Sequence, residues 1–338
     1  MNITCIGIDL AKHVFQMHGV DVTGKTIVRK QIKRHQLLAF FAQMPPALIG
    51  MEACGGSHYW ARELIKLGHD ARLMAPQFVK PYVKSGKNDA NDAEAICEAV
   101  SRPSMRFVTI KEVDQQVMQA EHRIRARLIR ARTALSNEIR GLLAEFGMIV
   151  ATSLGALRRR LPELLEDTEN GLSTAFRRLL SQLGDELRDL DARLKVYDQC
   201  LATQAKTDGR IQRLLKIEGI GPVVASALVS AVGNATQFRQ GRDMAAWLGL
   251  TPNQHSSGGK TCLGHISKRG DKYVRTLLIH GARAALKAAK NKEDGRSRWV
   301  MQLAQRRNNN IATVALANKN ARIAWSILSR GEAYRMAA

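Results

Sequence analysis

Short apolar runs with the length of β-strands dominate the first hundred residues. Residues 3–11 and 47–53 are almost continuously apolar, which is typical of strands covered on both faces of a sheet. Residues 14–21 and 26–33 form a further pair, separated by a turn that contains glycine. A fifth, short strand is expected at 70–75. The pattern predicts that this part of the chain is built on a β-sheet.

Helical stretches alternate with the later strands. Residues 35–43 and 57–67 have helical character, and a third helix is expected to begin near Asn91. Three adjacent strands followed by alternating helix and strand predict a mixed sheet flanked by helices. Ribonuclease-H-like folds begin in this order. Residues 1–108 are therefore predicted to form an α/β domain of that kind.

The middle of the chain has a different period. From 113 to 146, and again from 172 to 201, apolar residues recur every three or four positions. This spacing predicts two long amphipathic helices. They would form an antiparallel coiled-coil hairpin, a dimer interface, or two ordinary bundle helices. We assign residues 109–205 to a helical, coiled-coil linker.

Residues 206–338 are predicted to be an all-α region whose helices are joined by loops rich in Gly and Pro. Two of the helices flank Gly219-Ile-Gly221-Pro222. This sequence is like the turn of helix-hairpin-helix modules, whose glycine amides contact phosphates without reading sequence. Ordinary turns between helices also use Gly and Pro, so both interpretations stand.

Charge narrows the class of partner. Lys and Arg number 52 against 30 Asp and Glu, a formal net charge of +22, and residues 260–307 alone hold 13 basic and 3 acidic side chains. Such a field attracts polyanions, with nucleic acid first. An anionic membrane or a ribosome would also be attracted. No run of 18 apolar residues exists, and the N-terminus is typical of a strand, not a signal peptide.

The five cysteines are scattered and include no Cys-x-x-Cys pair. Their spacing indicates neither a zinc ribbon nor a disulfide framework. We expect a protein of the reducing cytoplasm.

Four acidic residues follow or begin predicted elements and are called here the acidic set: Asp9, Glu52, Asp89 and Asp92. Asp9 and Glu52 end buried strands, whereas Asp89 and Asp92 lie three apart at a helix start and share a face. Carboxylates gathered at the ends of neighbouring strands repel one another unless cations lie between them. Two Mg²⁺ ions are the expected occupants, since such a pair promotes phosphodiester displacement.

Each member of the acidic set has an ordinary alternative. An Asp after a strand is commonly a turn residue, and Asp89 and Asp92 could be helix N-caps. Glu52 is harder to explain away, because a charge inside an apolar strand needs partners or a cation. Glu94 is a substitute candidate for a ligand. The set in this order, rather than any one member, carries the metal prediction.

A second group of candidate residues lies between 247 and 270. Ser257 precedes Gly258-Gly259, where the backbone allows a phosphate to approach closely, and Lys260, Lys268 and Arg269 could neutralise that phosphate. A serine nucleophile needs a base, for which His255, His265 and a metal-bound hydroxide are candidates. The alternative is a Gly/Ser linker beside a basic surface.

Seven motifs together resemble one family. In chain order they are Gly-Ile-Asp-Leu-Ala-Lys, Gly-Met-Glu-Ala, Asn-Asp-Ala-Asn-Asp-Ala, Glu-Gly-Ile-Gly-Pro, Ala-Trp-Leu-Gly-Leu-Thr-Pro, Ser-Ser-Gly-Gly-Lys and Ile-Ser-Lys-Arg-Gly-Asp. The chain resembles, over nearly its whole length, the insertion-sequence transposases of the IS-one-ten type, including their triple-one-one subgroup.

The resemblance implies a RuvC-like domain whose Asp-Glu-Asp-Asp metal site falls on the acidic set. It also implies a C-terminal transposase domain with a nucleophilic serine, which falls on Ser257, with Ser256 adjacent. Such proteins are implied to act on element ends and target DNA, to be guided by a noncoding bridge RNA, and to work as dimers or tetramers in the bacterial cytoplasm at the nucleoid.

The mechanism expected from these residues is attack of Ser257 on a DNA phosphodiester with help from Mg²⁺, followed by resealing from the phosphoserine. No phosphate-binding Gly-x-x-x-x-Gly-Lys-[Ser/Thr] loop is present, and no nucleotide hydrolysis is required. Two rival functions remain. One is a RuvC-like junction-resolving nuclease that uses activated water, and the other is a non-enzymatic nucleic-acid binder.

Overall fold

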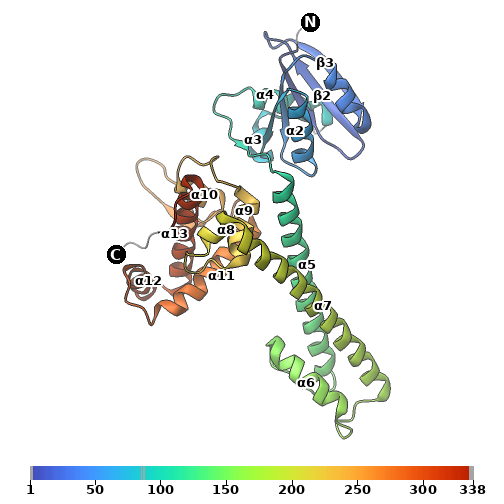
Figure 1. Ribbon diagram of the computed structural model, residues 1–338, viewed down its shortest axis with the longest axis vertical. Helices are drawn as coiled ribbons and strands as arrows, with labels where there is room; N and C mark the ends of the chain where they lie inside the picture. The colour runs from blue at the N-terminus through green and yellow to red at the C-terminus, as the bar shows by residue number, and fades with distance from the viewer. Residues whose placement is uncertain (1–2, 85, 87, 335–338) are drawn as a thin grey trace. The chain divides into compact units, whose positions relative to one another are not determined.

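The computed structural model of the protein describes residues 3–84, 86 and 88–334. The chain divides into two units, Met1–Val113 and Asp114–Ala338 (Figure 1). The mixed sheet predicted for the start of the chain lies in the first unit, and the long helices lie in the second.

The first unit contains a six-stranded sheet with the order β3-β2-β1-β4-β5-β6. The strands are β1 (Cys5–Asp9), β2 (Val14–Val20), β3 (Thr26–Lys33), β4 (Leu48–Glu52), β5 (Asp70–Met74) and β6 (Phe107–Val108). The strands β1, β4 and β5 are parallel to one another, and the other pairings are antiparallel. The predicted mixed sheet is confirmed.

Helices cover both faces of this sheet. They are η1 (Arg34–Gln36), α1 (Leu37–Ala42), α2 (Ser57–Lys66), α3 (Pro76–Val79), η2 (Lys80–Tyr82) and α4 (Asp89–Val100). Side chains of α1 and α2 pack in one core with Ile6 and Ile8, whereas α4 packs in a second core with Cys5. Because side chains alternate along a strand, the odd-numbered residues of β1 face α4.

The second unit begins with three helices, α5 (Val113–Ala144), α6 (Leu154–Glu166) and α7 (Thr174–Thr207). Their apolar stripes form one shared core. Arg125 pairs with Asp198 at 2.6 Å and Arg132 pairs with Asp191 at 3.0 Å. Later residues of α5 therefore contact earlier residues of α7. The two predicted long helices are therefore present and run antiparallel (Figure 1).

The rest of the second unit is mostly helical. It contains α8 (Gly209–Leu214), α9 (Pro222–Val232), α10 (Gly241–Trp247), β7 (Pro252–Gln254), β8 (Leu263–Ile266), α11 (Lys272–Ala289), α12 (Gly295–Arg306) and α13 (Asn309–Arg330). The central helix α13 contacts α10, α11 and α12. The expectation of an all-α region is wrong here, because β7 and β8 pair as an antiparallel hairpin. Both strands are short and largely exposed, so they lack the apolar alternation that would have predicted them.

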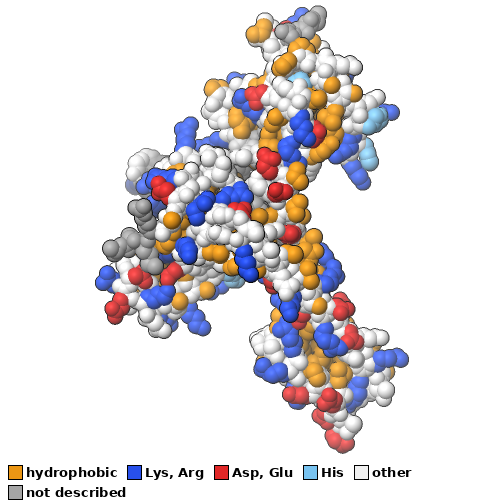
Figure 2. Space-filling view, in the orientation of Figure 1, with side chains coloured by type: hydrophobic (Ala, Val, Ile, Leu, Met, Phe, Trp, Pro, Cys, Tyr) orange, Lys and Arg blue, Asp and Glu red, His pale blue; other side chains and the backbone are white. Residues whose placement is uncertain are grey.

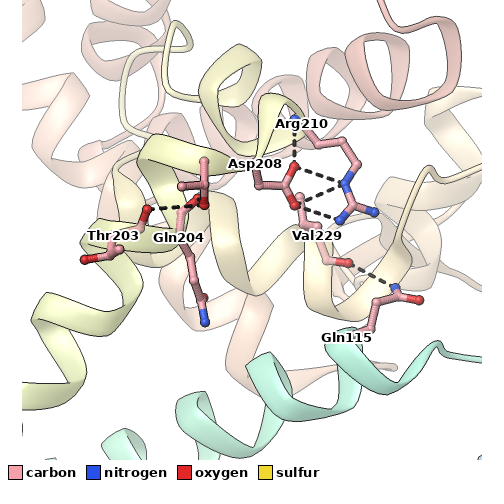
Figure 3. A network of polar contacts seen from close by, with 7 residues as sticks. Gln115, Thr203, Gln204, Asp208, Arg210 and Val229 are labelled. Carbon is pink, nitrogen blue, oxygen red and sulfur yellow. Dashed lines mark hydrogen bonds and ion pairs between the residues drawn. The ribbon is translucent and has the colours of Figure 1, made fainter.

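Polar contacts fix the junction between the long helices and this region (Figure 3). Asp208 caps α8 by accepting a hydrogen bond from the Arg210 amide, and its carboxylate also binds the Arg210 guanidinium at 2.7 Å. The Gln115 side chain, at the start of α5, donates to the carbonyl of Val229 in α9. Because α5 and α7 run antiparallel, the start of α5 and the end of α7 lie at the same end of the pair, and this end contacts α8 and α9.

Basic side chains are spread over the visible surface (Figure 2), as a net charge of +22 requires. Within the described ranges, no helix has the length and apolar character needed to cross a membrane.

Candidate active site

Asp9 and Glu52 lie side by side at one edge of the sheet. They are the last residues of the neighbouring parallel strands β1 and β4. The residues directly before them, Ile8 and Met51, are paired in the sheet. Ile8 and Met51 are buried on the α2 face. Because side chains alternate, both carboxylates project on the opposite face, which α4 covers. The sequence prediction that these two acids converge is consistent with this placement.

Two glycines allow α4 to lie close to those strands. A Cβ atom at Gly7 would lie 2.2 Å from the carbonyl oxygen of Ala93, and one at Gly50 would lie 2.7 Å from Cβ of Val100. Any larger residue would therefore push α4 away from the sheet. Along β1, Cys5 contacts Cys97 and Gly7 lies against Ala93, so α4 runs antiparallel to β1 and its first turn lies toward the Asp9 end.

The start of α4 is capped by Asn88 and not by an aspartate. The Asn88 side chain accepts a hydrogen bond of 2.8 Å from the amide of Asn91. Asp89 and Asp92 lie inside the first turn, where negative charge is favourable next to the helix N-terminus. The alternative that they are ordinary N-caps is therefore wrong.

The acidic set shares one electrostatic field. Burial raises the pKa of Asp9, and the charges of Asp89 and Asp92 raise it further. Burial likewise raises the pKa of Glu52, with added repulsion from Asp9 and Asp92. Asp9 is thus within electrostatic reach of Asp89 and Asp92, and Glu52 is within reach of Asp9 and Asp92, while their shared role as metal ligands stays a prediction.

The side chains do not form a ready-made metal cage. Among the described residues, no three His, Cys, Asp or Glu side chains come close enough together to hold a metal ion. Glu94, considered a substitute ligand, instead binds Lys84 at 2.5 Å, and this hydrogen bond lowers the pKa of Glu94. The carboxylates of the acidic set are therefore not clustered at the distances of metal ligands.

The candidate serine lies at the tip of the hairpin 252–266, called here the serine hairpin. The amide of Lys260 donates to the carbonyl of Ser257 at 3.0 Å, which closes a tight turn. Gly258 and Gly259 occupy the two central positions with φ of 56° and 75°. Positive φ at both positions defines a type I′ turn, which suits the twist of a two-stranded ribbon.

The two adjacent serines have different roles in this hairpin. The Ser256 hydroxyl oxygen accepts hydrogen bonds from the Gln254 side chain at 2.9 Å and the Cys262 amide at 3.3 Å. Ser257 is exposed, and within the described part of the chain its hydroxyl makes no hydrogen bond. Ser256 therefore fastens the hairpin, while Ser257 presents its hydroxyl to solvent.

The base of the serine hairpin is held by residues that the sequence did not single out. A Cβ atom at Gly270 would lie 1.8 Å from the carbonyl oxygen of Trp247, so the loops before β7 and after β8 are in close backbone contact. The buried guanidinium of Arg275 donates to the carbonyls of Leu248 at 3.0 Å and Arg269 at 2.8 Å. A charged residue in an amphipathic helix gave no sign of this role.

The predicted helpers of Ser257 are exposed. Lys260 and Arg269 lie at the surface, as do His255 and His265. Neither histidine side chain hydrogen-bonds Ser257 among the described residues. Lys268 has a left-handed backbone with φ of 53°, which is uncommon for a side chain of this size.

The turn between α8 and α9 contains the predicted glycines. Gly219 has φ of 82° and packs against α11, where a Cβ atom would lie 2.6 Å from the Gly281 carbonyl oxygen. Gly221 is exposed and has open space around it. Packing accounts for Gly219, and the phosphate-binding role of the two glycines stays a prediction.

Comparison with known proteins agrees with this architecture. A transposase family model with an Asp-Glu-Asp-Asp domain of the IS110 type matches residues 6–148, and a model described as the transposase IS116/IS110/IS902 family matches residues 211–298. These two spans hold the acidic set and the serine hairpin, respectively.

Whole-length relatives carry the same description. The chain is 57% identical, over 99% of both chains, to a probable family 20 transposase of Pseudomonas aeruginosa. It is 47% identical to the transposase for insertion sequence element IS1111A of Coxiella burnetii, over 100% of this chain and 93% of that one. It is 41% identical to the transposase for IS1328 of Yersinia enterocolitica, over 98% and 99%.

Fold, site and relatives together define a transposase, a protein that cuts and recombines DNA. The chain belongs to the IS116/IS110/IS902 family of insertion-sequence transposases.

Proposed function

We propose that the protein excises and inserts a mobile element by attack of Ser257 on DNA phosphodiesters, with two Mg²⁺ ions held by the acidic set. The observation that supports this most strongly is that Asp9 and Glu52 end neighbouring strands on the face that α4 covers, where burial and the charges of Asp89 and Asp92 raise the pKa of Asp9, and burial and the charges of Asp9 and Asp92 raise that of Glu52.

The acidic set suits a divalent cation. Its carboxylate oxygens are the ligands that Mg²⁺ prefers. Cations between the carboxylates would offset the repulsion that raises the pKa of Asp9 and of Glu52. When bound, the ions would polarise the scissile phosphate and stabilise the charge that develops on the attacking and leaving oxygens.

Ser257 is the better nucleophile of the two serines because its hydroxyl is exposed at the turn, whereas Ser256 holds the hairpin together. In the first step the Ser257 Oγ–P bond forms and the P–O bond to the neighbouring nucleotide breaks. The serine proton passes to a base, for which His255 and His265 are the candidates on the serine hairpin. The oxygen that leaves takes up a proton and becomes a free hydroxyl on the cut strand.

Resealing reverses this step after strand exchange. The free hydroxyl of a strand attacks the phosphoserine, and Ser257 leaves with its proton restored. Bond energy is kept in the serine–phosphate link, so no nucleotide hydrolysis is needed. The basic surface suits DNA and a guide RNA as partners. The acidic set and Ser257 belong to different units, and we propose that they act together in a dimer or tetramer, either within one subunit or between two.

Cleavage of element-end DNA by three matched variants tests this function. The protein is incubated with DNA, Mg²⁺ and RNA transcribed from the element flank. We expect Ser257→Ala and the double variant Asp9→Asn with Glu52→Gln to be inactive, and Ser256→Ala to keep at least part of its cleavage. Cleavage by Ser257→Ala would instead identify a water-dependent nuclease. Undiminished transposition by the double variant would identify a non-enzymatic binder.

A further inference from the structure

A groove of about 1370 Å³ lies within the second unit, next to the serine hairpin. One wall is formed by β7, β8 and the loop after them, and the floor is formed by α13. The start of α10 and Trp299 of α12 complete the lining. The groove shares His265 and other residues of the serine hairpin, and Lys268 of the neighbouring loop, and its remaining lining residues belong to none of the sites described above.

The groove is positively charged. Four basic side chains line it, Arg242, Lys268, Lys319 and Arg322. The described lining residues include no Asp or Glu. No ion pair between described residues involves any of the four. The helix α13 itself carries no acidic residue. A polyanion entering the groove would therefore meet cations that have no competing carboxylate.

An aromatic ring lies beside these charges. Trp299 is 36% exposed, and the Lys319 ammonium lies 4.4 Å from the centre of a Trp299 ring. Burial and the nearby charges of Arg296 and Arg322 lower the pKa of Lys319, so an incoming anion would relieve an existing repulsion. Trp325, by contrast, is fixed by a hydrogen bond from its indole N–H to the carbonyl of Phe238. Trp299 is thus the ring available for stacking.

The groove is continuous with the hairpin that carries Ser257. Pro252 of β7 and Ile266 of β8 line it, and the tip between these strands holds the serine. Lys268 lies two residues after the end of the hairpin, with its backbone in the left-handed region. The Lys268 amide donates to the carbonyl of Gly249 at 3.1 Å, so the backbone that carries this cation is fixed beside the groove.

We propose that this groove binds an unpaired stretch of a polynucleotide, with one base stacked on Trp299 and adjacent phosphates on Lys268 and Arg322. A flat aromatic ring among unpaired cations is the combination that binds single strands, because every base has a face to stack and every linkage has a charge. An acidic peptide could bind the cations, but it would not explain why the groove is continuous with the hairpin that carries Ser257. The choice of nucleic acid as the ligand rests on the proposed function. The inference adds where the nucleic acid binds and that the bound segment is single-stranded.

Binding of labelled oligonucleotides tests the proposal. Full-length protein carrying Ser257→Ala is titrated, in EDTA, with single-stranded DNA, single-stranded RNA and duplex DNA of one sequence, and anisotropy is recorded. These conditions exclude cleavage, so the result does not depend on whether Ser257 is the nucleophile. A missing adduct at Ser257 would count against the proposed function and leave this binding result intact.

Trp299→Ala should weaken binding of DNA or RNA single strands about tenfold, the effect of losing one stacked base. Trp299→Phe keeps a ring and should bind within about threefold of the parent. Arg322→Gln should reduce the slope of log K against log salt by about 0.7, the contribution of one phosphate contact on a single strand. The matched control is Arg283→Gln, which removes an exposed helical arginine outside the groove.

The single strand, DNA or RNA, that binds more weakly to Trp299→Ala and Arg322→Gln than to the parent protein is the ligand of the groove. Unchanged affinity of Trp299→Ala and Arg322→Gln for both single strands would overturn the proposal. So would an equal loss for duplex DNA, because a stacked base in a duplex is not available to Trp299. Since Trp299→Phe and Arg322→Gln are conservative surface changes, the test does not depend on correct folding of Trp299→Ala.

Discussion

Gly7 and Gly50 are partners in the parallel pairing of β1 and β4, and atoms of α4 fill the space that a side chain at either position would need. This pair of glycines sets how closely the helix that carries Asp89 and Asp92 approaches the strands that carry Asp9 and Glu52. The acidic set is therefore positioned by two residues that have no chemistry of their own.

The first prediction concerns this glycine pair. Gly7→Ala places a methyl group against the backbone of α4, which cannot rotate away, so the helix must shift. We expect the free energy of unfolding to fall by about 2 kcal/mol, as for overpacked cores, and DNA cleavage to fall with it. Urea denaturation measures the loss. Gly55→Ala, at an exposed position with open space around it, is the control and should be nearly neutral.

The second prediction concerns metal and pH. The folded state raises the pKa of Asp9 and of Glu52, so below neutral pH it binds more protons than the unfolded chain does. Their ionisation therefore destabilises the fold as pH rises. At pH 8 in EDTA, Asp9→Asn should melt at a higher temperature than the parent protein. Mg²⁺ at about 100 times its Kd should stabilise the parent by about 2.7 kcal/mol and the variant less.

Scanning calorimetry with and without Mg²⁺ measures both effects. The account would be contradicted if Asp9→Asn lowered the melting temperature in EDTA, or if Mg²⁺ stabilised both proteins equally. Asp189→Asn serves as a control, because Asp189 is exposed on α7 and makes no ion pair with a described residue.

The third prediction concerns a buried histidine in the second unit. His122 of α5 lies within 3.1 Å of the Tyr273 hydroxyl and of the Ser226 hydroxyl. Ser226 donates its own proton to the carbonyl of Pro222 at 2.7 Å, so His122 donates from Nε2 and accepts from Tyr273 at Nδ1. This arrangement uses the neutral ring, and burial lowers the pKa of His122 to about 4.

Because the pKa is lower in the folded state, the unfolded chain binds the extra proton between pH 6.5 and 4. Stability is full above pH 6.5 and is lost as the pH falls toward 4, by up to about 3 kcal/mol for this residue. His122→Gln should flatten this part of the stability curve of the second unit. His280→Gln, at an exposed position of α11, should leave the curve unchanged. An unaltered acid limb in His122→Gln would refute the assignment.

The fourth prediction concerns Arg275, which positions the serine hairpin through two backbone carbonyls. Arg275→Lys cannot reach both Leu248 and Arg269, so the loops at the hairpin base should loosen. We expect faster hydrogen exchange at the amides of Ser267 and Lys268, which are bonded across the two loops. Cleavage should fall about tenfold, the effect of about 1.4 kcal/mol of lost positioning. Lys272→Gln, exposed on the same helix, is the control; equal exchange in both variants would exclude the positioning role.

Much of the fold was predictable because its signals are local. The apolar runs of β1 and β4 and the three-to-four spacing of α5 and α7 identified these elements and their types. The neighbouring placement of Asp9 and Glu52 was predictable because the carboxyl ends of neighbouring parallel strands lie side by side, whereas the metal-binding role of the acidic set stays a prediction. The N-cap of α4 was not predictable, since Asn88 and Asp89 are equally good caps by residue type. Only the structure shows that Asn88 accepts the hydrogen bond from the Asn91 amide.

Other features depend on contacts between distant segments. The hairpin of β7 and β8 was missed because its strands are exposed and follow no apolar alternation, although Gly258-Gly259 is typical of its turn. Arg275 gave no signal, because its partners are carbonyls of loops that come together only in the folded protein. Gly7 and Gly50 stand in buried strands, and glycine there often marks the close approach of another segment.

The most direct test of the central claim is mass spectrometry of the covalent adduct. The protein is incubated with Mg²⁺, flank RNA and a nicked element end that cannot be religated, and it is then denatured and digested. The account predicts a nucleotide bound through phosphate to Ser257, absent from Ser257→Ala and from the Asp9→Asn, Glu52→Gln protein. Cut DNA with no protein-bound nucleotide, or an adduct on any residue other than Ser257, would contradict it.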